Sequence, residues 1–261
     1  MSDQAIRRPT VFITGAAGGI GLAAALRFHA AGWRVLAADR DAAGLQALQR
    51  LTSADRLVTV CCDVTSSAEV TAAFECLKER FGPALDLLVN NAGVLHVGRF
   101  EELDAAEHDQ TIRVNVNGVL AVLHAAFPFL KAARGARVVN MSSASAVFGV
   151  PEFASYSASK FFVRGLTEAL AVEWRAHEIH VCHVMPAFVA TGMVEDQHAD
   201  SMDRLGVRLT AEQVAEVVFR AATRRKRLSW PVGGGFRVLR IILGPAPEWL
   251  KKRIMGWITG Y

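Results

Sequence analysis

Residues 10–21 read TVFITGAAGGIG, and this stretch sets the architecture of the whole chain. A run rich in β-branched residues predicts a buried strand, and an alanine-rich pattern of helical spacing follows it directly. Between them the glycines have the spacing G-x3-G-x-G, from Gly15 through Gly19 to Gly21. Glycine lets a backbone turn sharply and approach a pyrophosphate, which then lies at the helix N-terminus. We therefore expect Gly15, Gly19, Ile20 and Gly21 to form a dinucleotide-binding turn.

Short apolar runs alternate with segments of helical spacing along most of the remaining chain. Residues 87–89 (LLV) and 138–139 (VV) are entirely apolar, which indicates strands buried on both faces. Strict alternation of strands and helices predicts βαβ units and a parallel sheet. The expected fold class is α/β, a doubly wound, Rossmann-like parallel sheet with helices on both faces and ligands at the carboxyl ends of its strands. We expect strands at 10–14, 34–39, 56–61, 86–90, 136–142 and 179–184, and helices at 19–31, 42–52, 67–81, 101–131 and 154–176.

The length and composition fit one globular domain. The chain has 261 residues, of which 52% are hydrophobic, and no linker rich in Pro, Gly or Ser divides it. This content is enough for a sizeable core and excludes a disordered chain. We expect a single dinucleotide-binding domain over residues 1–261, with 188–206 as a substrate lid and 236–261 as a basic amphipathic C-terminal extension.

Cysteine usage and charge indicate the cellular setting. The four cysteines show no CxxC spacing and no pattern of a disulfide framework, and the N-terminus does not read as a signal peptide. These features predict a cytoplasmic protein. Residues 220–261 hold ten Lys and Arg and one acid, a formal charge of +9, whereas the other residues hold 19 bases and 24 acids, or −5. The basic character belongs to the tail, so nucleic acid is not expected as a partner.

The end of the second expected strand indicates which dinucleotide binds. Asp39 follows Gly21 by 18 residues, where an acid accepts hydrogen bonds from the adenosine ribose hydroxyls. A carboxylate there also repels a 2′-phosphate. The adjacent Arg40 favours the phosphorylated cofactor instead. Weighing the two, the sequence predicts NAD as the cofactor, with NADP as the alternative.

Four motifs occur in a fixed order. They are the glycine turn, Asn90-Asn91-Ala92-Gly93 after the fourth strand, Ser143 after the fifth, and Tyr156 with Lys160 on the following helix. In this order and spacing the chain resembles the short-chain dehydrogenase/reductase family in its single-domain form, over residues 10 to about 192. The resemblance implies an oxidoreductase that uses NAD(P) and acts on CH–OH groups.

The expected catalytic residues are Asn115, Ser143, Tyr156 and Lys160. Tyr156 and Lys160 are four residues apart, so their side chains project from one helix face. A nearby ammonium and a positive nicotinamide ring favour the phenolate and bring tyrosine closer to a working acid–base pKa. The resemblance selects Ser143 among neighbouring serines to orient the substrate oxygen. It also implies that Asn115 kinks a helix and links Lys160 to solvent through a water.

Further cofactor contacts are implied by the resemblance. Asp63 matches the acid that binds the adenine amino group, with Val64 beside it. Pro186 opens a loop in which Ala187 stands where the family has glycine. The implied cofactor-binding residues after the second strand are Asp63, Val64, Asn91, Ala92, Gly93, Tyr156, Lys160, Pro186, Val189 and Thr191. No metal site is expected, because His180 and His183 are three apart on a strand and face opposite sides.

Three functions remain open at this point. The favoured one is hydride transfer between NAD(H) and the hydroxyl or ketone of a hydrophobic small molecule, by a homodimer or homotetramer. An NADPH-dependent 3-oxoacyl or other ketoreductase is the alternative, with the basic tail docking an acidic carrier protein. The third is a non-catalytic dinucleotide-sensing protein, which the presence of both Tyr156 and Lys160 disfavours.

The tail also has two interpretations. Leu250, Ile254, Trp257, Ile258 and Tyr261 form one apolar stripe at helical spacing, and bases lie largely off it. Such a stripe more often packs over a pocket or in a subunit interface, which is the favoured interpretation. A basic amphipathic helix with tryptophans also suits peripheral contact with an anionic membrane.

Overall fold

The protein is described by a computed structural model that covers residues 7–53, 55–195, 206, 209–224, 227–243 and 246–260. The side chains at 194–195, 239–243 and 258 fall outside this description, as does most of the expected lid. All strands of the main sheet run parallel, in the order β3-β2-β1-β4-β5-β6-β9. They are β1 (Thr10–Thr14), β2 (Arg34–Asp39), β3 (Leu57–Cys61), β4 (Leu87–Asn90), β5 (Arg137–Met141), β6 (His180–Pro186) and β9 (Ser229–Val232).

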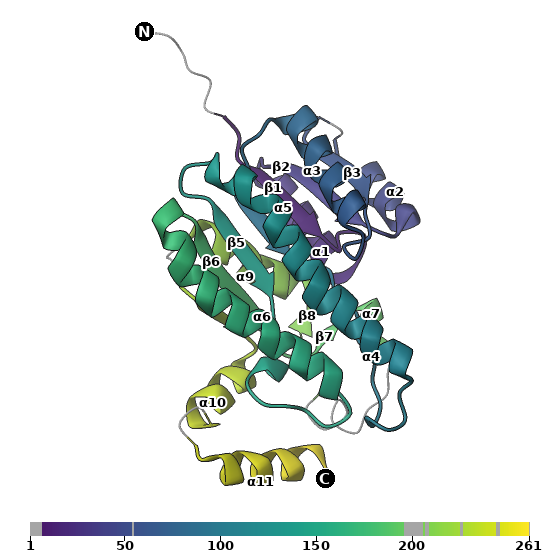
Figure 1. Cartoon of the computed structure of the whole chain (residues 1–261), viewed down its shortest axis with the longest axis vertical. Coiled ribbons are helices and arrows are strands. Elements are labelled where there is room, and N and C mark those ends of the chain that lie inside the picture. The colour runs from purple at the N-terminus through teal and green to yellow at the C-terminus, as the bar shows by residue number, and fades with distance from the viewer. Residues whose placement is uncertain are drawn as a thin grey trace.

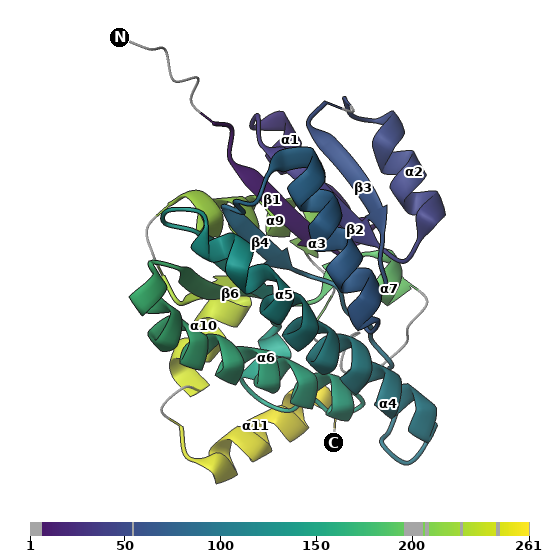
Figure 2. The same cartoon turned by 45° about the horizontal axis from the view of Figure 1, so that its top comes forward.

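Helices cover both faces of the sheet, so the expected doubly wound, Rossmann-like architecture is confirmed. α1, α2 and α9 contribute to the core on one face, and α3, α5 and α6 to the core on the other. Figures 1 and 2 show α5 and α6 crossing in front of the strands and α9 behind them. The helices are α1 (Gly19–Ala30), α2 (Ala42–Arg50), α3 (Ser67–Phe81), α4 (Ala105–Ile112), α5 (Val119–Lys131), α6 (Ala154–Glu173), α7 (Gly192–Glu195), α9 (Ala211–Thr223), α10 (Gly234–Leu243) and α11 (Glu248–Thr259).

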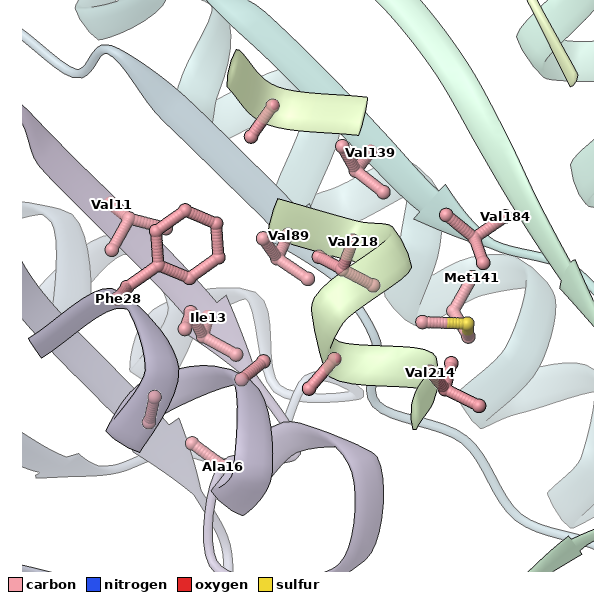
Figure 3. Packing of buried hydrophobic residues seen from close by; sticks show 14 of the residues in the cluster. Val11, Ile13, Ala16, Phe28, Val89, Val139, Met141, Val184, Val214 and Val218 are labelled. Carbon is pink, nitrogen blue, oxygen red and sulfur yellow. The ribbon is translucent and has the colours of Figure 1, made fainter. Parts of the chain in front are cut away.

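The side chains of strand β1 alternate between the two cores. Val11 and Ile13 belong to the core beneath α1 and α9, whereas Phe12 belongs to the opposite core and stacks on Phe74 of α3 with ring centroids 4.5 Å apart. Figure 3 shows residues of α9, including Val218, against the side chains of the strands. Because both faces are buried, every residue of β1 is buried.

The expected helix at 101–131 is wrong in two details. The helix begins at Ala105, and a π-helical segment, Arg113–Gly118, joins α4 to α5. By length and composition alone, the continuous helix Ala105–Lys131 is long and apolar enough to cross a membrane. One face of this helix nevertheless packs in the core through Val114, Val122 and Leu130, as core helices of globular proteins do.

The chain beyond residue 186 contains elements that the sequence reading did not identify. The two-residue strands β7 (Val189–Ala190) and β8 (Leu209–Thr210) pair in parallel at the two ends of the expected lid. α9 and β9 then extend the main fold. The tail forms α10 and α11, which lie at one end of the molecule in both views (Figures 1 and 2).

Candidate active site

Functional side chains gather at the carboxyl edge of the sheet. Because all of the strands are parallel, their carboxyl ends lie at one edge. Asp39 ends β2, Asn91 follows β4, Ser143 follows β5 and Pro186 ends β6. Asp63 lies just beyond the end of β3. Each of these positions was expected to touch cofactor or substrate.

The glycine turn forms a cradle that side chains would fill. Gly15 has a φ of +66°, and a Cβ there would lie 2.9 Å from the Cα of Ala92. A Cβ on Gly21 would overlap the carbonyl oxygen of Gly15. At Gly93 a Cβ would lie 3.2 Å from Asn115 Oδ1 and 3.5 Å from Lys160 Nζ. This arrangement fits a dinucleotide whose phosphates approach the backbone at the N-terminus of α1.

Two polar side chains hold this turn against the end of β4. The amide nitrogen Nδ2 of Asn91 donates to the carbonyl oxygens of Thr14 and Gly15, at 3.0 and 3.1 Å. Thr14 Oγ1 accepts from the backbone N–H groups of Asn91 and Ala92, both at 3.0 Å. Thr14 is a structural residue of the site that the sequence reading missed.

We expect Thr14→Val to destabilise the protein by roughly 2–4 kcal/mol, since valine has the same shape and leaves two inward-facing N–H groups without an acceptor. Thr14 is fully buried, so water cannot replace the hydroxyl. Urea unfolding of both proteins measures the difference. Thr14→Ser, which keeps the oxygen, is the matched control and should lose much less. Equal losses in the two variants would show that the hydroxyl does not hold the turn.

A small cavity of about 100 Å³ opens on the β2 side of the glycine turn. Asp39 lines it and accepts from the backbone N–H groups of Ala17 (2.9 Å) and Asp41 (3.0 Å). A carboxylate has about four acceptor positions, so acceptor capacity remains for a ligand hydroxyl. Hydrogen bonds from the Thr65 backbone and hydroxyl hold the pKa of Asp63 below its usual range. The described lining residues are Gly15, Asp39, Arg40, Cys62, Asp63, Val64, Ala92, Gly93, Val94 and Val114.

A larger cavity of about 610 Å³ opens on the β5 and β6 side, and Ser143, Tyr156 and Lys160 all line it. Ser143 caps the short 3₁₀ turn Ala144–Ala146, which holds its hydroxyl at the end of β5. Burial raises the pKa of the Tyr156 phenol above its ordinary value. The hydrogen bond with the Ser143 side chain offsets only part of this rise in pKa. The serine and tyrosine hydroxyls therefore lie next to each other at the cavity wall.

Lys160 is a buried ammonium beside the tyrosine ring. Its side chain is only 5% exposed, and its Nζ lies 5.4 Å from the centroid of the Tyr156 ring. The Nζ donates to the carbonyl oxygen of Met141 at 3.2 Å. Burial lowers the pKa of Lys160 to about 8. An ammonium has three donors, so Lys160 retains the capacity to donate to a ligand hydroxyl in the cavity.

Asn115 lies in the π-helical segment and acts on the backbone around the site. Its Oδ1 accepts from the Val94 N–H (2.8 Å), and its Nδ2 donates to the Val94 carbonyl (2.9 Å) and to Ser159 Oγ (3.2 Å). Ser159 in turn donates to the Tyr156 carbonyl at 2.7 Å. Asn115 thus ties the segment after β4 to the helix that carries Tyr156 and Lys160. Ser159 is a second residue of the site that the sequence reading missed.

Much of the remaining lining of the larger cavity is apolar. Pro186, Val189 and Thr191 line the cavity from the loop after β6, and Thr191 also lies close to Gly19 of the glycine turn. The Ala187 N–H donates to the Val232 carbonyl at 3.3 Å, which fixes this loop to β9. Its apolar lining residues include Leu95, Phe148, Val150, Phe153, Phe188, Met193, Leu209 and Phe236.

Comparisons with known proteins establish the family. The sequence profile described as short chain dehydrogenase matches residues 9–202. A D-threitol dehydrogenase of Mycolicibacterium smegmatis is 36% identical over 181 residues, which are 69% of this chain and 69% of that protein. The chain therefore belongs to the short-chain dehydrogenase family, and it is an oxidoreductase of alcohol and ketone groups.

Solved structures agree with this assignment. The 3-ketoacyl-(acyl-carrier-protein) reductase from Brucella melitensis, complexed with NADH, has a TM-score of 0.80 and 30% identity, covering 87% of this chain and 98% of that one. A short-chain dehydrogenase/reductase from Burkholderia phymatum in complex with NAD has a TM-score of 0.78 and 26% identity, covering 92% and 96%. The resemblance expected from the sequence is confirmed.

Proposed function

We propose that this protein transfers a hydride between NAD(H) and the hydroxyl or ketone of a hydrophobic small molecule. The observation that carries the proposal is the larger cavity, which is lined by Ser143, Tyr156 and Lys160 together with many apolar side chains. A substrate with its oxygen at the hydroxyl pair and its apolar body at Phe153 satisfies both parts. The bound nicotinamide ring would supply the hydride acceptor or donor.

The chain's own residues position the substrate and move a proton. In oxidation, Tyr156 Oη takes the proton of the substrate hydroxyl, and in reduction it returns a proton to the ketone oxygen. Ser143 Oγ holds that oxygen against the phenol. The Lys160 ammonium would stabilise the phenolate by its charge, and it is one of the residues that would hold the cofactor. Asn115 acts as a positioning residue because it fixes the segments on either side.

The smaller cavity supports NAD as the cofactor. Two carboxylates, Asp39 and Asp63, and one guanidinium, Arg40, line it. A ribose with free hydroxyls can donate to Asp39, whereas a 2′-phosphate would place two further negative charges near this carboxylate. The similar structures from Brucella melitensis and Burkholderia phymatum are complexes with NADH and with NAD. We therefore propose that Asp39 has more influence than Arg40 on the choice of cofactor.

The test is a titration of the purified protein with NADH and with NADPH, followed by thermal stabilisation. NADH should bind more tightly. Asp39→Asn removes the charge and keeps one acceptor oxygen, so it should shift the ratio of the two dissociation constants toward NADPH by roughly tenfold or more. Arg40→Gln is the companion variant and should shift the ratio the other way. A native preference for NADPH would mean that Arg40, and not Asp39, determines which cofactor binds.

An NADPH-dependent 3-oxoacyl or other ketoreductase is the second candidate. Arg40 at the ribose cavity and the similarity to a 3-ketoacyl reductase structure favour it. Because residues 220–261 carry a formal charge of +9, an acidic acyl carrier could dock on them. NADPH preference together with activity on carrier-bound acyl substrates would distinguish this reaction from oxidation of a free alcohol.

A homodimer or homotetramer is part of the proposal. The helices on the α4–α6 side expose large apolar side chains, namely Ile112 (39%), Leu120 (41%), Phe161 (41%) and Phe162 (37%). Adjacent exposed apolar residues of this size mark association surfaces. Light scattering after size-exclusion chromatography measures the molar mass.

A further inference from the structure

The C-terminal helix α11 turns its tryptophans away from the protein. Met255 and Thr259 are buried, at 6% and 0% exposure, and Met255 packs against Val150 and Phe153. Trp249 is 67% exposed and Trp257 is 81% exposed. The helix is therefore anchored by one face, while the largest apolar side chains of the tail point to the solvent.

These tryptophans share their face with positive charge. Trp249, Arg253 and Trp257 follow one another at intervals of four residues, so their side chains lie along one side of the helix. Arg253 is exposed, and so is the neighbouring Lys252. On α10, Val238 is 57% exposed. We call the exposed side chains of Val238, Trp249, Lys252, Arg253 and Trp257 the tail surface.

We propose that the tail surface binds an anionic lipid bilayer in its interfacial region. A basic helix with exposed tryptophans has the composition that lies in a membrane interface, because the indole ring has an apolar body and a polar N–H. Residues 234–261, which include α10 and α11, carry five bases and one acid, a formal charge of +4, and the rest of the chain carries 24 bases and 24 acids. The net positive charge of the chain therefore lies on the segment that also exposes the tryptophans, which suits anionic lipid headgroups.

A second copy of the chain is a poorer occupant of the tail surface. A two-fold contact would place the same segment of each chain against the other, with a charge of +4 on both sides. An anionic lipid surface avoids this repulsion, because its headgroups are negative. It can also contact the outer face of a terminal helix. Figures 1 and 2 show α11 at an end of the molecule, where a flat surface can reach it.

Docking in this way would have a consequence for the larger cavity. Phe153 and Val150, against which α11 packs, also line that cavity. Lipid would therefore lie near the cavity that receives an apolar substrate. This consequence rests on the proposed function, whereas binding to the bilayer does not.

The test is co-sedimentation of the full chain with vesicles of phosphatidylcholine, with and without phosphatidylserine. We expect binding to the phosphatidylserine vesicles, release at high salt because screening weakens the charge attraction, and little binding to phosphatidylcholine alone. Trp249→Ser with Trp257→Ser should lower the partition coefficient by roughly tenfold for each tryptophan, the factor expected for burial of a large apolar side chain. Lys252→Glu with Arg253→Glu should abolish the dependence on phosphatidylserine.

The matched control is Leu51→Ser with Val172→Ser, which removes two apolar side chains of similar exposure, 67% and 71%, from other parts of the surface. This control should bind vesicles as the native protein does, and the melting temperatures verify that all variants are folded. No sedimentation with either vesicle, or equal sedimentation of the tryptophan variant, would overturn the proposal. A lower molar mass of the tryptophan variant in the absence of lipid would assign the tail surface to self-association. If the protein bound polyglutamate as tightly as phosphatidylserine vesicles, and the tryptophan variant bound it equally well, the tail surface would be assigned to an acidic protein.

Discussion

Replacing Tyr156 with phenylalanine is expected to lower kcat by between about 10² and 10⁴, the usual contribution of a positioned general acid–base group. The variant loses only the phenolic oxygen, which hydrogen-bonds the Ser143 side chain. The ring stays in the apolar cluster with Phe153, with which it makes an edge contact at 6.5 Å between centroids. The measurement is the steady-state rate with a substrate found by screening secondary alcohols and ketones.

Two readouts separate chemistry from folding in this variant. NADH should still stabilise Tyr156→Phe, because the glycine turn, Asp39 and Lys160 are unchanged and the variant loses at most one contact with the cofactor. Ser143→Ala should also reduce kcat and leave NADH binding intact, because Ser143 only orients the oxygen. A Tyr156→Phe enzyme that kept more than a tenth of the native kcat would remove Tyr156 from the acid–base role.

Replacing Lys160 with methionine is expected to stabilise the folded protein at pH 7 by roughly 3 kcal/mol while it impairs turnover. Burial lowers the pKa of Lys160 from 10.5 to about 8, so the folded state holds this ammonium at a cost in free energy. Methionine has a similar length and no charge to bury. The site would then be an example of stability given up for function.

The stability difference between the native and Lys160→Met proteins should depend on pH. Below pH 8 both folded and unfolded chains hold the Lys160 proton, so the full cost is present. Between about 8 and 10.5 the unfolded chain binds more protons than the folded one, and the stability of the native protein rises with pH. Above 10.5 both states are neutral and the advantage of the methionine variant disappears.

Urea unfolding of native and Lys160→Met proteins at pH 7 and pH 10.5, at equal protein concentration, measures the effect. Lys78→Met is the matched control, since its side chain is 56% exposed and should show no such trend. A variant less stable than the native protein at pH 7 would mean that contacts such as the Lys160–Met141 hydrogen bond outweigh the burial of charge.

The sheet could be predicted from the sequence where strands are buried on both faces. In a chain whose strands and helices alternate, a short and continuous apolar run such as residues 87–89 indicates a buried strand. The seventh strand, β9, was missed because it has four residues, includes Pro231 and is the edge strand. Proline lacks a donor and is tolerated at edges, so this stretch has no recognisable strand pattern.

Helix α9 was missed although its signal is present. Thr210 and Gln213 form a capping box, and Val214, Val217, Val218 and Ala221 make a buried stripe at helical spacing. The π-helical segment is different. Its Asn115 bonds to Val94, which is 21 positions away, so no local pattern could reveal it. Likewise, the role of Thr14 depends on backbone groups about 77 positions away.

The packing of α9 on α1 has a consequence for the order in which the chain can fold. Arg27 of α1 pairs with Glu216 at 2.8 Å and covers the Phe219 ring at 3.6 Å, and Phe28 contacts the same ring. Helix α1 therefore packs against residues that are synthesised about 190 positions later. During synthesis the N-terminal half must leave the ribosome with one face of α1 exposed. That face stays uncovered until residue 223 has emerged, and a chain that stops at residue 202, where the family match ends, would leave it uncovered.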